Sequence, residues 1–139
     1  MAFDAGLVRA IALELDRELS QSRIEKINQT EKDEIVLLLH TRSGQKRLTL
    51  SASANNPRIY ISSVSKENPP VPPLFCTLLR KQIGGARVLS IAQVGFERVI
   101  EIALDSHDEL GYARKKYIYL EIMGRYSNIR ISKWIKRRW

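Results

Sequence analysis

Apolar residues recur every three or four positions over the first twenty residues, which is the spacing of one face of an α-helix. Asp4 stands just before this pattern, where an N-cap residue is expected. A second helical pattern follows the segment 67–73, because proline suits the first turn of a helix, and Gly84 ends it. The sequence therefore predicts two amphipathic helices, whose apolar faces are Leu7, Val8, Ile11, Leu15 and Leu19 in the first, and Leu74, Phe75, Leu78, Leu79 and Ile83 in the second.

The rest of the chain consists of short runs of β-branched and aliphatic residues separated by turn-forming residues. Four such runs precede the second helix and four follow it, with a polar loop at 105–113. Together they predict an α+β fold, in which mostly antiparallel sheets, arranged as a sandwich or pseudo-barrel, are flanked by two helices. The expected strands are 23–29, 33–40, 46–51, 58–62, 86–94, 97–104, 115–122 and 127–132, the first three forming a meander.

Length and composition limit the class of protein. A chain of 139 residues is long enough for one compact domain. No apolar run approaches the roughly 18 residues of a membrane span, and no segment has the pattern of a secretion signal. The single cysteine, Cys76, fits a reducing compartment. We therefore expect a cytoplasmic protein that makes no membrane contact.

The net charge of +8 is unevenly distributed. Residues 1–113 hold 14 basic and 14 acidic side chains, whereas residues 114–139 hold nine basic side chains and one acidic side chain. Clustered Lys and Arg attract phosphates, and the counterions they release drive association with a polyanion. The charge alone leaves two interpretations open, a nucleic-acid contact and a solvated basic tail.

Catalytic and metal-binding patterns are lacking. His40 and His107 show no metal-ligand spacing with each other or with Cys76, which fits a small packing residue on the second helix. The acidic residues of the 105–113 loop lack the spaced oxygen ligands of a calcium loop. We therefore expect no enzymatic activity, no catalytic residue, no bound metal and no cofactor.

Two arginines stand out from the strand alternation. In the expected strand 97–104, Arg98 shares a face with Phe96 and Ile100, so it either covers apolar surface at the sheet rim or is held for binding. Glu97 falls on the opposite face, and the two side chains meet only if the backbone is irregular. We expect that irregularity at Gly95–Phe96.

The second arginine, Arg125, follows the last strand but one. In 115–122 the alternation places Ile118, Leu120 and Ile122 in the core and leaves Tyr117, Tyr119 and Glu121 outward. Gly124–Arg125 then reads as a turn that exposes Arg125 beside Tyr126. Such a turn is either an ordinary connection or a contact that binds phosphate and stacks on a base, a combination used for RNA.

Taken together, several segments resemble the N-terminal module of the NFACT family. They are "MAFDAGLVRAIALEL", "RIEKINQTEKDEIVLLL", "LSASANNPRIYI", "PPLFCTLLRKQIGGARVLSIAQVGFERVI" and "YLEIMGRYSNI", in the family's order. The resemblance covers residues 1–131 and leaves 132–139 as a basic tail that does not resemble the family.

The resemblance implies a fold related to the N-terminal domain of formamidopyrimidine-DNA glycosylases. It also implies a module that, with further domains, engages tRNA on the separated large ribosomal subunit during ribosome quality control and supports tailing of stalled nascent chains. Glu97 and Arg98 match an acidic residue and an arginine associated with tRNA handling, although the family usually has aspartate at the first position. The RNA-binding residues implied are Glu97, Arg98, Glu121, Met123, Gly124, Arg125 and Tyr126.

Other functions remain as alternatives. Family members are often labelled fibronectin-binding protein A, which suggests an adhesin that binds fibronectin. The glycosylase-like fold suggests binding to DNA lesions, but Ala2-Phe3 replace the proline and glutamate of the glycosylases, so we expect no base-excision activity.

Overall fold

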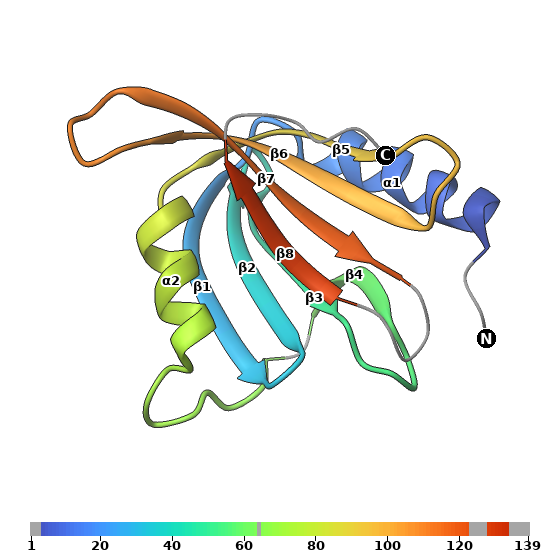
Figure 1. The fold of residues 1–139 in the computed structure, drawn as a ribbon, viewed down its shortest axis with the longest axis horizontal. Helices are drawn as coiled ribbons and strands as arrows, with labels where there is room; N and C mark the ends of the chain where they lie inside the picture. Colours follow the sequence, from blue (N-terminus) through green and yellow to red (C-terminus); the bar gives the residue numbers. More distant parts are fainter. Residues whose placement is uncertain (1–3, 64, 123–127, 134–139) are drawn as a thin grey trace.

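The computed structural model describes residues 4–63, 65–122 and 128–133. Eight strands form one antiparallel sheet with two helices packed on it, as Figure 1 shows. The elements in chain order are α1 (Ala5–Leu19), β1 (Arg23–Glu31), β2 (Glu34–Thr41), β3 (Gly44–Ser51), β4 (Arg58–Ser62), α2 (Leu74–Ile83), β5 (Arg87–Gln93), β6 (Val99–His107), β7 (Ala113–Glu121) and β8 (Asn128–Lys133).

The strand order divides the sheet into two meanders. Its order is β4-β3-β2-β1-β5-β6-β7-β8, so the connection through α2 carries the chain from one edge strand to the middle of the sheet. There β1 and β5 share a single paired position, Arg23 opposite Arg87. Each half is a four-stranded meander, and the sheet bends where the two halves join (Figure 1).

One apolar core lies between the two halves of the sheet and the helices. In the first half, β2 is buried along the whole of Ile35–Leu39, because alternate residues face the core and the outer surface of the sheet is also covered. The second half contributes alternate residues of β6 and β7 to the same cluster. The expectation of an α+β fold with mostly antiparallel strands and two flanking helices is confirmed.

Helix α1 forms where the periodicity predicted it. The Asp4 side chain caps it, since its Oδ1 accepts a hydrogen bond from the Leu7 backbone N–H at 2.8 Å. The helix packs along β5, where Asp16 Oδ1 accepts a hydrogen bond from the Ile91 backbone N–H at 2.8 Å. This contact fixes the helix lengthwise on the strand that leads to the β5–β6 turn.

Helix α2 buries a narrower face than the sequence predicted. Cys76, Leu79 and Ile83 are buried, in agreement with a packing role for the cysteine. Leu74 and Leu78, which were expected on the apolar face, are exposed, Leu74 to 86%. The helix packs on β1 and, through the Gln82 carbonyl, accepts hydrogen bonds from Ser106 of β6 and Lys116 of β7. Leu74 and Leu78 lie on its solvent side.

The β6–β7 hairpin is longer than predicted. The sequence suggested a loop at 105–113, whereas the strands continue to His107 and resume at Ala113, so the hairpin extends beyond the body of the sheet (Figure 1). No helix within the described residues is long and apolar enough to cross a membrane.

Candidate nucleic-acid interface

The turn between β5 and β6 presents three exposed side chains in a row. Its backbone is closed by two hydrogen bonds of 3.0 Å, from Val94 N–H to the Val99 carbonyl and from Glu97 N–H to the Val94 carbonyl. Gly95 adopts a φ of 53°, the left-handed conformation in which glycine is least strained. The expected irregularity at Gly95–Phe96 is therefore present. It takes the form of the hairpin turn itself, and Phe96, Glu97 and Arg98 all lie exposed on it.

The position of this turn corrects the strand assignment. We expected a strand from residue 97, with Phe96 and Arg98 on its apolar face, but β6 starts only at Val99. Phe96 is 82% exposed and Arg98 is also exposed, so strand alternation does not govern either side chain. Within the described residues, neither the Glu97 carboxylate nor the Arg98 guanidinium forms an ion pair. The structure therefore does not support the interpretation in which the Arg98 side chain covers apolar surface at the rim of the sheet.

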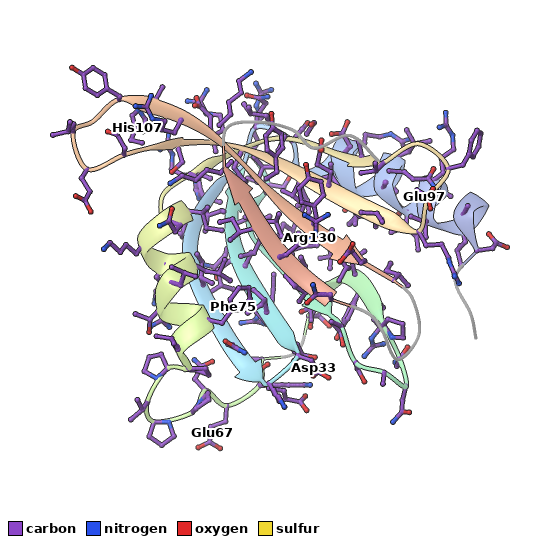
Figure 2. The ribbon with its side chains drawn as sticks, viewed as in Figure 1. Asp33, Glu67, Phe75, Glu97, His107 and Arg130 are labelled. Atoms are coloured by element: carbon purple, nitrogen blue, oxygen red, sulfur yellow. The ribbon has the colours of Figure 1, made fainter. Side chains whose placement is uncertain are left out.

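Gln93 fastens the turn to the start of α1. Its side-chain Nε2 donates to the Glu97 carbonyl at 2.9 Å and to the Ala5 carbonyl at 2.8 Å. The acceptor oxygen of the same amide, Oε1, is buried and has no hydrogen-bond partner among the residues that the structure describes. Figure 2 shows Glu97 on the turn beside the N-terminal end of the helix. The helix thus acts as a rigid support for the exposed turn.

The two regions singled out from the sequence lie side by side. Val99 pairs with Glu121 in the β6–β7 register, and the Ile122 N–H donates to the Arg98 carbonyl at 2.8 Å. The end of β7 is therefore bonded to the turn that carries Arg98. Met123, Gly124, Arg125 and Tyr126 follow Ile122 in the sequence and lie outside the described residues.

Glu121 is held by neighbouring side chains of the sheet. Its Oε1 lies 3.5 Å from Arg130 Nε on β8 and accepts a 3.5 Å hydrogen bond from Asn128 Nδ2. The Arg130 guanidinium also sits over the Tyr119 ring, 4.6 Å from its centroid. These contacts hold the Glu121 carboxylate against β8 at the end of β7.

Tyr119 is buried, although alternation correctly placed it on the face opposite Ile118 and Leu120. It does face away from the main core, but its side chain is fully covered. Its hydroxyl donates to Glu101 Oε2 at 3.0 Å, across the β6–β7 pair. Burial, with the adjacent Glu101 carboxylate, raises the pKa of Tyr119 to about 12. The β6–β8 polar cluster, made of Glu101, Tyr119, Glu121 and Arg130, therefore joins the three strands behind the candidate site.

Phe96 is the residue that the sequence interpretation missed. It was assigned to an apolar strand face, yet it stands exposed beside Glu97 and Arg98. The signal that could have identified it is Gly95, because a glycine expected to distort the backbone also ends the strand alternation. An aromatic ring next to an acceptor and a guanidinium supplies the three contacts that hold an unpaired nucleotide: stacking, base-edge hydrogen bonds and phosphate pairing.

In the part of the chain that the structure describes, no group of three or more His, Cys, Asp or Glu side chains could hold a metal ion. His40 and His107 are both exposed.

Comparisons with known proteins identify the family of the chain and solved structures with the same fold. A family model described as NFACT N-terminal and middle domains matches residues 4–133. The Bacillus subtilis (strain 168) protein named Rqc2 homolog RqcH is 36% identical over 129 residues, which cover 93% of this chain and 23% of that protein. The N-terminal domain of the fibronectin-binding protein PavA from Streptococcus pneumoniae superposes with a TM-score of 0.91 at 37% identity, covering 95% of this chain and 50% of that chain.

The N-terminal part of the fibronectin/fibrinogen-binding protein from Streptococcus suis gives a TM-score of 0.91 at 33% identity, covering 95% of this chain and 49% of that chain. This chain therefore spans less than a quarter of the RqcH relative and about half of each solved chain.

Proposed function

We propose that this chain, which belongs to the NFACT family, is the tRNA- and large-ribosomal-subunit-binding module of a ribosome-quality-control factor that supports tailing of stalled nascent chains. Its relatives named Rqc2 homolog RqcH support the quality-control role. The observation that carries the proposal is the rigidly held turn on which Phe96, Glu97 and Arg98 stand exposed beside the end of β7.

In this function the turn binds a nucleotide whose base is unstacked from its neighbours. The Arg98 guanidinium donates to a phosphate or to a base edge, because its fork of N–H groups matches either acceptor. The Glu97 carboxylate accepts from an exocyclic amino group, and the Phe96 ring stacks on the base face. No catalytic group is needed, since the module holds the RNA for a reaction carried out elsewhere.

The segment after Ile122 adds the second side of the proposed site. Glu121 contacts Arg130 on β8, and Gly124 and Arg125 come after Ile122 and Met123 in the sequence. We assign Arg125 to a phosphate contact and Tyr126 to stacking, and we include Met123 and Gly124 of the same sequence motif among the proposed RNA-binding residues. This assignment rests on the match to the family's motif and on the hydrogen bond between the Arg98 carbonyl and the Ile122 N–H.

The test is a titration of labelled bulk tRNA with the 139-residue chain and its Arg98→Met variant. Methionine keeps the apolar stem and removes the guanidinium, so we expect loss of a charge-assisted contact of about 1.5–3 kcal/mol, a roughly ten- to hundredfold weaker Kd. Lys32→Met on the β1–β2 turn is the control, because it removes the same charge from a distant exposed position.

We expect Glu97→Asp to be tolerated, since it restores the acid usual in the family. Equal tRNA affinities for Arg98→Met and Lys32→Met, with both variants folded, would remove Arg98 from the site.

Fibronectin binding is the second candidate function, because two of the most similar solved structures are named fibronectin-binding proteins. Surface plasmon resonance with purified fibronectin tests it on the same variants. Fibronectin binding that Arg98→Met leaves unchanged, in a chain that binds no tRNA, would favour this candidate. A parallel titration with lesion-containing duplex DNA tests the third candidate function, binding to DNA lesions.

A further inference from the structure

A basic hollow lies at the end of α1 opposite the Phe96–Arg98 turn. It has a volume of about 580 Å³ and is bounded by the C-terminal turn of α1 and by the β2–β3 hairpin. Its cationic lining residues are Arg17, Arg42 and Lys46, and one acid, Glu18, also lines it. In the part of the chain that the structure describes, Arg17, Arg42 and Lys46 form no ion pair. The hollow thus carries a net positive charge.

The floor of the hollow is rigid. Gln21, which follows the helix, has a φ of 70°, a conformation that a residue with a side chain adopts only when its surroundings require it. Its N–H donates to the Val88 carbonyl at 2.6 Å, and the buried Ser22 Oγ donates to the Leu19 carbonyl at 2.6 Å. The cations therefore surround a fixed surface, so binding requires little ordering of the backbone.

Helix α1 sets the distance between this hollow and the proposed nucleotide site. Its first residue, Ala5, is hydrogen-bonded to Gln93 at the β5–β6 turn, and its last turn contributes Arg17 to the hollow. A helix of 15 residues is about 22 Å long. One extended RNA backbone of that span reaches both ends of the helix, whereas a single nucleotide does not.

We propose that the hollow bounded by Arg17, Arg42 and Lys46 is a second RNA contact, which binds the phosphate backbone of the same molecule held by the Phe96–Arg98 turn. The ligand class is an RNA backbone phosphate. Cations around a wide, open hollow with hydroxyl-bearing Ser20 and Ser43 match phosphate oxygens and provide no aromatic surface for a base. This inference rests on the proposed function, since it requires that the chain bind RNA.

The experiment compares two double variants that remove equal charge. Arg42→Gln/Lys46→Gln removes the two positive charges on the β2–β3 side of the hollow. Lys32→Gln/Lys81→Gln removes two exposed positive charges elsewhere. Each protein, the wild type and Arg98→Met are titrated with labelled bulk tRNA from 50 to 300 mM salt, after thermal melts establish that all are folded. Each lost phosphate contact lowers the slope of log affinity against log salt by roughly 0.7–0.9.

We expect the Arg42→Gln/Lys46→Gln slope to fall by about 1.4–1.8 relative to the wild type. The control double variant should change the slope much less. Equal slopes for the two double variants would overturn the second contact, while loss of binding in Arg98→Met alone would leave the proposed function standing. If the wild type binds no tRNA under any condition, both the function and this inference fail.

Discussion

Single residues show where strand alternation predicts orientation but not burial. The alternation placed Tyr119 on the face opposite Ile118 and Leu120, and that assignment is correct. Its full burial depends on the Arg130 guanidinium over the ring and on Glu101 from the next strand. Those partners come from β8 and β6, so only the strand registers, which are tertiary information, could reveal that this face is covered.

Tyr119 makes stability depend on pH in the alkaline range. Its pKa in the folded chain, about 12, exceeds the usual 10, so the folded state binds the phenolic proton more tightly. This contribution to stability is fully present below pH 10 and is lost as pH rises through 12, by at most about 1.4 kcal/mol per pH unit. Urea unfolding between pH 8 and pH 11.5 should show a steeper decline for the wild type than for Tyr119→Phe.

The control for this effect is Tyr117→Phe, which removes a phenol from the same strand without the Glu101 hydrogen bond. It keeps the Tyr119–Glu101 pair, so its stability should still decline steeply in the alkaline range. Parallel profiles for Tyr119→Phe and the wild type would show that the cluster does not hold the phenolic proton.

At the scale of the element, the sequence predicted the place of the β5–β6 turn but not its length. Gly95 was identified as a point of distortion because glycine tolerates conformations that other residues avoid, and the turn falls there. The bond between the Arg98 carbonyl and the Ile122 N–H could not be predicted, because it joins residues brought together by the β6–β7 register. The local preference of glycine thus predicted the turn, whereas the contact between the turn and Ile122 depends on long-range strand pairing.

Substitution of Gly95 tests whether this turn geometry positions the site. An added Cβ meets no atom within 4 Å, so the cost comes from the backbone conformation alone. We expect Gly95→Val to destabilise the chain by about 1–2 kcal/mol and to weaken tRNA binding, whereas Gly95→Asn changes both little, because asparagine adopts the left-handed region more readily. Thermal melts and the tRNA titration measure the two effects. Full tRNA affinity in Gly95→Val would separate the turn conformation from binding.

Helix α2 offers a paired test of its corrected packing. Helical periodicity placed Leu74 and Leu79 on one apolar face, but only Leu79 is buried. Leu79→Ala should cost about 2–5 kcal/mol in the free energy of unfolding, as removal of a core leucine does. The same change at Leu74 should stay within about 0.5 kcal/mol. A cost at Leu74 comparable to that at Leu79 in urea unfolding would contradict the exposed position of Leu74.

At the scale of the whole molecule, the sequence indicated the meanders but not how they join. Hydrophobic runs and turn residues predict strands that pair with their chain neighbours, which accounts for β1 to β4 and for β5 to β8. The placement of β5 against β1 depends on the path through α2 and on long-range backbone hydrogen bonds around the paired position of Arg23 and Arg87, such as Val88 N–H to the Ser22 carbonyl at 2.7 Å. That junction brings α1 alongside β5, and the helix then separates the basic hollow from the Phe96–Arg98 turn.

The charge distribution of the whole chain leads to the last prediction. Residues 1–113 are balanced in charge, and the excess of +8 lies in residues 114–139. We expect tRNA affinity to fall steeply between 50 and 200 mM salt, because the bound cations release counterions. Removing residues 134–139 deletes Lys136, Arg137 and Arg138, so the salt slope should fall by roughly 2–3, equally for tRNA and for heparin.

Arg98→Met should instead weaken tRNA binding much more than heparin binding, since heparin has no base for the Phe96–Arg98 turn to bind. A truncation that weakens only tRNA binding would assign specificity to the tail, and a salt-independent affinity would contradict a phosphate-driven contact.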